Sequence, residues 1–245
     1  MCRHLTWLGR ERSLSSLLLE PEWSLQRQSY EPRRQSNGIM NVDGFGIAWY
    51  QKRLRAEPAQ YRRSVPIWSD TSFPTFAPIV RSNAFLASLR SVVIGQPVQE
   101  SDTAPFVRGR WAFSFNGSVA LDALESVAEF RVVFVNPCDA TILAAVVFDR
   151  VLRGDAPEVA LADVVTRCAA KDPEARLNLM LTNGTSVYAT THGASLSYLH
   201  DRGLAEGGLL VASEPLDDDP RWVDVPNHSL IVADQGSVAR QNLEN

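Results

Sequence analysis

Apolar and polar positions alternate from the first residues of the chain. Residues 2–8 (CRHLTWL) alternate in the manner of a β-strand that begins at the N-terminus itself. The apolar run after it predicts a short helix from Ser13 to Glu20, with Ser13 as N-cap and Pro21 as the stop. Residues 21–42 are polar and contain two prolines, so they predict a long loop of a length that is often functional.

Strand patterns dominate the next part of the chain. Residues 43–50 (DGFGIAWY) alternate strongly, and further strands are predicted at 60–69, 84–91 and 111–115. The pair Asn116-Gly117 directly follows and is the strongest short turn signal in the sequence. A period of 3.6 residues then predicts two helices: Asp139 to Arg153, with Asp139 as N-cap and Gly154 at its end, and Glu158 to Lys171.

Strands return after the two helices. They are predicted at 176–182, 185–191, 196–200, 208–213 and 229–233, joined by turns such as Asn183-Gly184 and Gln235-Gly236. Strands, two central helices and again strands indicate a layered α+β fold rather than a parallel βαβ sheet. No internal repeat or low-complexity linker divides the chain, so we expect residues 1–245 to form a single domain.

Composition narrows the classes of function. The chain has 245 residues, of which 45% are hydrophobic and 21% charged, as in ordinary globular proteins. A net charge of −4 gives no reason to expect nucleic acid or an anionic membrane as partner. The three cysteines, Cys2, Cys138 and Cys168, are too few and odd in number for a disulfide framework, which favours a reducing, cytoplasmic setting. No signal peptide and no membrane span of about 20 apolar residues is recognisable.

Cys2 is the first candidate for chemistry. If Met1 is removed, one residue carries both a thiol and a free α-amine, whose ordinary pKa values are about 8.5 and about 8. Proton exchange between them is then nearly thermoneutral, so the amine can act as base toward the thiol. Taken alone, Cys2 is as well explained as a cysteine that merely follows methionine.

Other motifs give Cys2 a context. In order, they are Met1-Cys2-Arg3-His4, Asn41-Val42-Asp43-Gly44-Phe45-Gly46, Ser88-Leu89-Arg90-Ser91, Thr103-Ala104-Pro105-Phe106, Phe115-Asn116-Gly117 and Cys138-Asp139-Ala140-Thr141. Their order and spacing resemble the class II glutamine amidotransferases, a family of N-terminal nucleophile hydrolases. The stretches MCRHLTWLG, SYEPRRQSNGIMNVDGFG and ASEPLDDDPRWVDVP resemble a branch of that family that hydrolyses a γ-glutamyl conjugate in ergothioneine biosynthesis.

The resemblance implies a fold and a set of roles. The fold would be a four-layer αββα sandwich. Cys2 would be the nucleophile, and the Asn116 side-chain amide with the Gly117 backbone N–H would form the oxyanion hole. Arg90 would bind the α-carboxylate of the glutamyl group and Asp139 its α-ammonium. Without the resemblance, Arg90 is as readily a surface arginine, Asp139 a helix N-cap, and Asn116-Gly117 an ordinary hairpin turn.

The sequence departs from the family pattern at Ser88, Val93, Phe115 and Phe45, which leaves the leaving group and the tuning of the site open. No metal or organic cofactor is expected, because His4, His192, His200 and His228 do not pair with the cysteines at any metal-binding spacing; we expect core or surface histidines. Trp7, Phe45 and Trp68 are candidate cation–π partners for a cationic leaving group.

Three functions remain open on the sequence. The first is a hydrolase that cleaves a γ-glutamyl amide of a small molecule through a Cys2 thioester. The second is a glutaminase subunit that supplies ammonia to a separate synthase. The third is a γ-glutamyl-binding module without turnover, which the departures from the pattern keep open. The sequence does not specify an oligomeric state.

Overall fold

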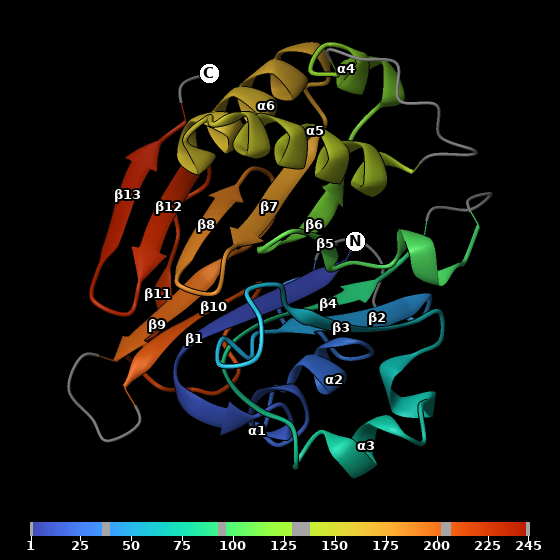
Figure 1. Cartoon of the computed structure of the whole chain (residues 1–245). Coiled ribbons are helices and arrows are strands. Elements are labelled where there is room, and N and C mark those ends of the chain that lie inside the picture. The colour runs from blue at the N-terminus through green and yellow to red at the C-terminus, as the bar shows by residue number, and fades with distance from the viewer. Residues whose placement is uncertain (1, 36–39, 93–96, 129–137, 202–206, 244–245) are drawn as a thin grey trace.

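The computed structural model describes residues 2–35, 40–92, 97–128, 138–201 and 207–243. In Figure 1 the described elements lie in four layers: helices, a sheet, a second sheet and further helices. The two sheets face each other, α4, α5 and α6 cover one of them, and α1, α2 and α3 lie on the outer side of the other. This arrangement confirms the predicted α+β class and the four-layer αββα sandwich.

The first sheet has seven strands in the order β11-β9-β10-β1-β4-β2-β3. Their bounds are β1 Arg3–Ser13, β2 Gly44–Trp49, β3 Ala59–Arg63, β4 Arg81–Arg90, β9 Ser197–Asp201, β10 Gly208–Ala212 and β11 Val223–Asp224. The N-terminal strand β1 is central and pairs antiparallel with both β4 and β10. Two neighbours therefore fix the position of the strand that follows Cys2.

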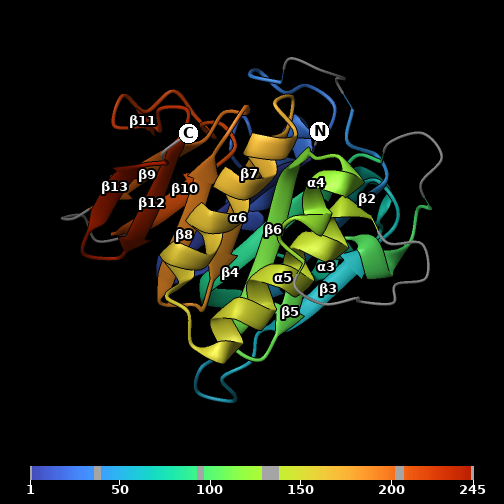
Figure 2. The ribbon, with the colours of Figure 1, turned by 90° about the horizontal axis from the view of Figure 1, so that it is seen from above.

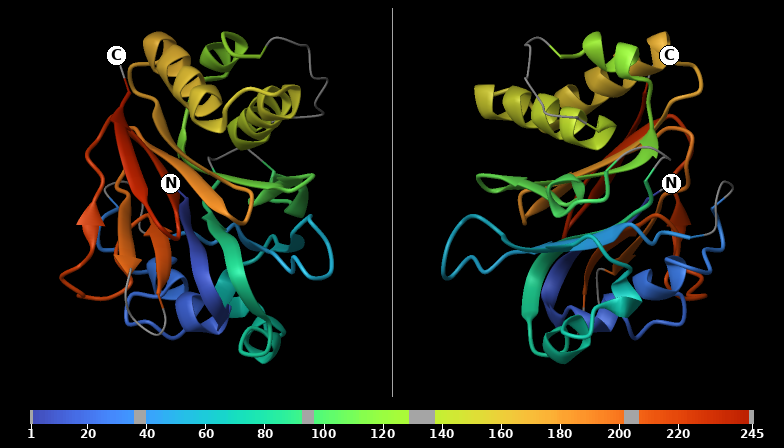
Figure 3. Two further views of the ribbon diagram at one scale, coloured as in Figure 1. Left: turned by 60° about the vertical axis from the view of Figure 1, so that its left-hand side comes forward. Right: turned by 90° about the vertical axis from the view of Figure 1, so that its right-hand side faces the viewer.

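The second sheet has six strands in the order β13-β12-β8-β7-β6-β5. Their bounds are β5 Phe106–Arg108, β6 Trp111–Ser118, β7 Arg176–Thr182, β8 Ser186–Thr191, β12 Ser229–Asp234 and β13 Val238–Asn242. Every strand pairs antiparallel with its neighbours. Figure 3 shows this sheet and the first one as two layers between the two groups of helices.

Six α-helices and two 3-10 turns belong to the described residues. They are α1 Ser15–Leu18, α2 Leu25–Gln28, η1 Ile67–Ser69, α3 Phe73–Phe76, η2 Glu100–Asp102, α4 Leu121–Glu125, α5 Asp139–Arg153 and α6 Pro157–Lys171. In α5 the buried side chains recur at helical spacing, among them Leu143, Val146 and Val147, and these face the six-stranded sheet. The helix ends at Gly154, whose φ of 110° suits glycine. Figure 2 shows α5 and α6 lying across that sheet.

Three apolar clusters hold the layers together. One lies between α4–α6 and the six-stranded sheet, and includes Phe113 and Phe148. A second lies between the seven-stranded sheet and α1–α3, and includes Trp7 and Phe45. The third lies between the sheets, and includes Leu8. Because strand side chains alternate between faces, each central strand contributes to two clusters.

Several local predictions were wrong. Ser13 ends β1, and Leu14 is the N-cap of α1. The predicted loop 21–42 contains α2, capped by the Ser24 hydroxyl, which accepts the backbone N–H of Arg27. The predicted strand 60–69 divides into β3 and η1 around Pro66. These elements are too short to show a clear period in the sequence.

The predicted turn at Asn116-Gly117 was also wrong. Both residues lie inside β6, where Asn116 pairs with Asn178 and Gly117 with Leu177. Glycine at this position allows the backbones of β6 and β7 to approach closely and does not form a turn. A Cβ on Gly117 would lie 1.8 Å from the carbonyl oxygen of Arg176. Asp139 is the first residue of α5, and Cys138 rather than Asp139 is its N-cap.

Among the described residues, no helix is both long and apolar enough to cross a membrane.

Candidate active site

The first sheet brings Cys2 next to the end of β4. Arg3 pairs with Leu89 in the register of β1 and β4, so Cys2 lies beside Arg90 and Ser91. The Cys2 thiol is partly buried and donates to the backbone carbonyl of Ser91 at 3.9 Å, a long contact for sulfur. The nucleophile candidate thus lies at the end of a central strand, held by main-chain pairing rather than by a flexible loop.

A small pocket surrounds the Cys2 thiol. Its lining comes from both sheets and from α5: Cys2, Ser88, Leu89, Arg90, Ser91, Asp102, Ala104, Phe115, Gly117, Cys138, Asp139 and Ala140. Four of the five residues that the sequence singled out, Cys2, Arg90, Gly117 and Asp139, therefore meet around one cavity. They come from four separate elements, and only the fold brings them together.

Asn116 is the fifth candidate and lies one residue from the lining. Its side chain is fully buried and points between the two sheets. The Nδ2 amide donates to the Ser213 hydroxyl at 3.5 Å, and Oδ1 has no hydrogen-bond partner in the part of the chain that the structure describes. Gly117, which follows it, lines the pocket with its backbone.

Arg90 carries the positive charge of the pocket. Its side chain is buried; Nη2 donates to the carbonyl of Pro97 at 3.2 Å and lies 3.8 Å from Asp102 Oδ2. Nη1 is buried and has no hydrogen-bond partner among the described residues. A buried guanidinium with an unused donor suits a carboxylate ligand, because the planar fork can make two parallel hydrogen bonds. The sequence analysis did not identify Asp102 as a site residue. It could have been suspected only from its position directly before the Thr103-Ala104-Pro105-Phe106 motif.

Asp139 supplies the negative charge opposite. Its Oδ1 accepts the backbone N–H of Ala140 at 2.8 Å. Burial raises the pKa of this carboxyl above its ordinary range, while the backbone hydrogen bonds and the Arg90 charge act in the opposite direction. A cation such as a primary ammonium would remove that penalty and bind as the counter-charge.

The Cys2 thiol has a raised pKa. Burial is the main cause, and the Asp139 charge adds to it. A backbone hydrogen bond of Ser91 that favours the thiolate, the N-terminal charge and Arg90 all lower the pKa, but less than burial raises it. The thiol is therefore protonated at neutral pH in this state and needs a base to become a nucleophile.

None of the four histidines lines the pocket around Cys2. His4 is fully buried between the sheets, where its Nδ1 is 2.9 Å from the Ser114 hydroxyl, and burial lowers its pKa to about 3. His192 and His228 contact each other, with 3.1 Å between their Nδ1 atoms. Among the described residues, no group of three His, Cys, Asp or Glu side chains is placed to hold a metal ion.

The departures from the family pattern have different surroundings. Ser88 and Phe115 line the pocket. Phe45 is a core residue that packs on Phe73 and Tyr61. Val93 lies outside the described residues. Of the aromatic candidates for a cationic leaving group, Trp7 and Phe45 are buried in the core, and Trp68 makes an exposed edge contact with Tyr30.

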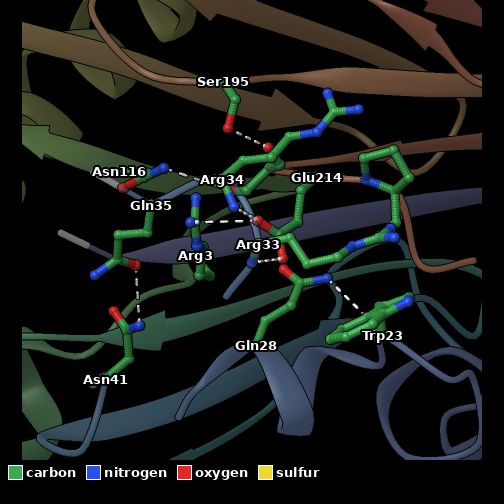
Figure 4. Close-up of polar contacts among 12 residues, drawn as sticks. Arg3, Trp23, Gln28, Arg33, Arg34, Gln35, Asn41, Asn116, Ser195 and Glu214 are labelled. Atoms are coloured by element: carbon green, nitrogen blue, oxygen red, sulfur yellow. Dashed lines mark hydrogen bonds and ion pairs between the residues drawn. The ribbon is translucent and has the colours of Figure 1, made fainter. Parts of the chain in front are cut away.

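Glu214 links the three long stretches that the sequence singled out. Its carboxylate is fully buried and accepts the backbone N–H of Arg33 at 3.0 Å and of Arg34 at 2.8 Å, while Nη2 of Arg3 lies 3.4 Å away (Figure 4). Arg33 also pairs through its side chain with the exposed Asp218. One carboxylate thus binds three segments of the chain: Arg3, residues 33–34 and the segment after β10.

Comparison with solved structures defines the class of fold. A glutamine aminotransferase class-II domain protein from Silicibacter pomeroyi superposes with a TM-score of 0.69 over the whole of both chains, at 23% identity. The glutamine phosphoribosylpyrophosphate amidotransferase from B. subtilis gives a TM-score of 0.71, at 13% identity, over 99% of this chain and 49% of the other. The fold is that of the class II glutamine amidotransferase domain.

Sequence comparison identifies the family within this class. No protein-family model matches the chain. A curated protein of Mycobacterium tuberculosis (strain CDC 1551 / Oshkosh), named gamma-glutamyl-hercynylcysteine sulfoxide hydrolase, is 41% identical over 244 residues, which is 100% of this chain and 97% of the relative. A protein of the same name from Mycolicibacterium smegmatis is 42% identical over 233 residues, 94% of this chain and 95% of the relative. The chain belongs to the gamma-glutamyl-hercynylcysteine sulfoxide hydrolase family.

Proposed function

We propose that the chain hydrolyses the γ-glutamyl amide of γ-glutamyl-hercynylcysteine sulfoxide, releasing glutamate and hercynylcysteine sulfoxide, with Cys2 as the nucleophile. The observation that carries the proposal is the pocket in which a thiol, a carboxylate and an arginine surround one cavity, where one arginine donor has no partner in the described part of the chain. A γ-glutamyl group offers an electrophilic amide carbonyl, a carboxylate and an ammonium, one for each of these groups. Family membership supplies the identity of the leaving half.

Removal of Met1 precedes the reaction and frees the α-amine of Cys2. The amine takes the thiol proton, and the thiolate attacks the γ-carbonyl to form a tetrahedral oxyanion. Asn116 Nδ2 and the Gly117 N–H stabilise this oxyanion. The protonated amine returns the proton to the leaving nitrogen, the C–N bond breaks, and a glutamyl thioester remains on Cys2. Water then attacks the thioester, releases glutamate and restores the thiol.

Binding of the glutamyl half depends on charge. Arg90 receives the α-carboxylate through the donor that has no partner among the described residues, and Asp139 receives the α-ammonium. Both side chains are largely removed from water, so these contacts are stronger than they would be at the surface. The same anchors would accept glutamine, so they do not by themselves separate a hydrolase of conjugates from a glutaminase.

The test is a comparison of substrates with a defined enzyme form. Intact mass first establishes whether the purified protein lacks Met1. The protein is then incubated with γ-glutamyl-hercynylcysteine sulfoxide and, separately, with glutamine, and released glutamate is followed by mass spectrometry. We expect turnover of the conjugate and much slower turnover of glutamine. Equal or faster hydrolysis of glutamine would favour a glutaminase, and no turnover by protein lacking Met1 would favour a binding module.

Two cysteine variants complete the test. Cys2→Ala should retain substrate binding and lose turnover, because loss of the nucleophile in a comparable hydrolase costs on the order of 10⁶-fold in kcat. Cys168→Ala is the matched control, since Cys168 is a buried residue of α6 whose thiol donates to the carbonyl of Ala123 and does not line the pocket. Retention of activity in Cys2→Ala would contradict the proposed nucleophile.

A further inference from the structure

The Asn116 side chain has only one hydrogen-bond partner among the described residues, and that partner is Ser213. Ser213 directly follows β10 and is fully buried. It belongs to the stretch ASEPLDDDPRWVDVP, to which the proposed mechanism gives no role.

The Ser213 hydroxyl has three contacts, and they leave it little freedom. Its oxygen accepts the backbone N–H of His4 at 3.0 Å and the Nδ2 amide of Asn116 at 3.5 Å. Its own proton goes to the backbone carbonyl of His4 at 3.2 Å. A hydroxyl has one proton and two acceptor lone pairs, so this set uses its full capacity.

These contacts determine which end of the Asn116 amide faces Ser213. With its proton on the carbonyl of His4, which also accepts the backbone N–H of Ser213 at 2.9 Å, the hydroxyl accepts from Asn116, and the amide presents its NH₂ group to it. One hydrogen of Nδ2 then points at Ser213, and the second stays available. No other described residue fixes the amide, because Oδ1 has no partner.

The same hydroxyl joins the two halves of the site. His4 lies on β1 of the seven-stranded sheet, two residues from Cys2, and Asn116 lies on β6 of the six-stranded sheet. A second contact runs parallel to it, because His4 Nδ1 lies 2.9 Å from the hydroxyl of Ser114, two residues before Asn116. Polar contacts thus connect the strand of the nucleophile to the strand of the oxyanion hole.

We propose that Ser213 is a positioning residue that holds the Asn116 amide with its NH₂ toward the oxyanion and in register with the strand that carries Cys2. The inference rests on the proposed function, since it deepens the role of Asn116 in that reaction. Ser213 itself does not touch the substrate. Its removal should therefore affect the step in which the oxyanion forms and leave binding of the glutamyl half intact.

The test is Ser213→Ala, assayed with γ-glutamyl-hercynylcysteine sulfoxide. Loss of one oxyanion donor costs about 100- to 1,000-fold in kcat, and a misdirected amide loses part of that, so we expect kcat to fall by about 10- to 100-fold with KM within about threefold. The rate of Cys2 alkylation by iodoacetamide should stay unchanged, because the nucleophile is intact. Ser195→Ala is the matched control (Figure 4): its hydroxyl donates to the backbone carbonyl of Ser213 at 2.7 Å and does not reach Asn116.

A double variant tests whether Ser213 acts through Asn116. In an Asn116→Ala background, Ser213→Ala should cause no further loss of kcat, because the group it positions is gone. Wild-type kcat in Ser213→Ala, an equal loss in Ser195→Ala, or full additivity with Asn116→Ala would each overturn the inference. If the wild-type protein hydrolyses neither substrate, the proposed function fails; a crystal structure of Ser213→Ala then decides the inference, which requires the Asn116 amide to turn.

Discussion

Removal of the charge on Glu214 should destabilise the fold strongly. The carboxylate is fully buried and accepts two backbone N–H groups, from Arg33 and Arg34, beside the guanidinium of Arg3. In Glu214→Gln one amide oxygen can still accept one N–H, but the NH₂ group faces the other donor. One buried N–H then loses its acceptor, and Arg3 loses its counter-charge in a site with little access to water.

The magnitude follows from these losses. A buried donor without a partner costs about 1–3 kcal/mol, and breaking a buried ion pair from one side costs about 3–5 kcal/mol. The two overlap, so we expect Glu214→Gln to lower the free energy of unfolding by about 3–5 kcal/mol. At about 2–4 °C per kcal/mol for a chain of this size, the Tm should fall by roughly 6–20 °C.

Urea unfolding and calorimetry measure this change, and Asp218→Asn is the control. Asp218 pairs with the side chain of Arg33 at 2.7 Å, but its own side chain is 79% exposed. Exposed pairs contribute about 0–1 kcal/mol, so this variant should unfold almost as the wild type does. A loss below about 1 kcal/mol in Glu214→Gln, or equal losses in the two variants, would refute the reasoning from burial.

Two further predictions concern β1 and β6. Burial, with a smaller contribution from the Arg3 charge, lowers the pKa of His4 to about 3, whereas the unfolded chain takes up this proton below about 6.5. The contribution of His4 to the free energy of unfolding is therefore complete above pH 6.5 and falls by about 1.4 kcal/mol per pH unit below it. His4→Asn should reduce the loss of unfolding free energy between pH 6.5 and 4.5 by about 2–3 kcal/mol, measured by urea unfolding at each pH. Gly117→Ala would place a Cβ 1.8 Å from the Arg176 carbonyl oxygen, so the β6–β7 pairing must shift. We expect this variant to have at least 100-fold lower kcat and a lower Tm. Wild-type kinetics in this variant would contradict the placement of Gly117.

The sequence predicted the long elements well. The helix from Asp139 to Arg153 was predicted with the bounds that α5 has, because fifteen residues show a 3.6-residue period clearly. The turn signal at Asn116-Gly117 misled because cross-strand pairing with Asn178 and Leu177 outweighs a local two-residue preference. Short elements such as α2 depend on the tertiary packing around them and show no such period.

The site was predicted unevenly for a similar reason. Cys2, Arg90, Gly117 and Asp139 became candidates because they belong to motifs with a known order, and the structure places all four around one pocket. Ser213 and Glu214 were not singled out as individual residues. Their partners, His4, Arg3 and Arg33, lie about 180 to 210 residues away along the chain, so only the folded sheet reveals the contacts.

The central place of β1 has a consequence for the order of events during synthesis. One of its two neighbours, β10, begins at Gly208 and is made about 200 residues after Cys2. At about 5–20 residues per second, a ribosome needs roughly 10–40 seconds for that length. During this time the first strand lacks one of its flanking partners, and the sheet around it is incomplete. The removal of Met1 that the proposed function requires would thus have a window of seconds on the nascent chain, before folding closes the sheet around the start of β1.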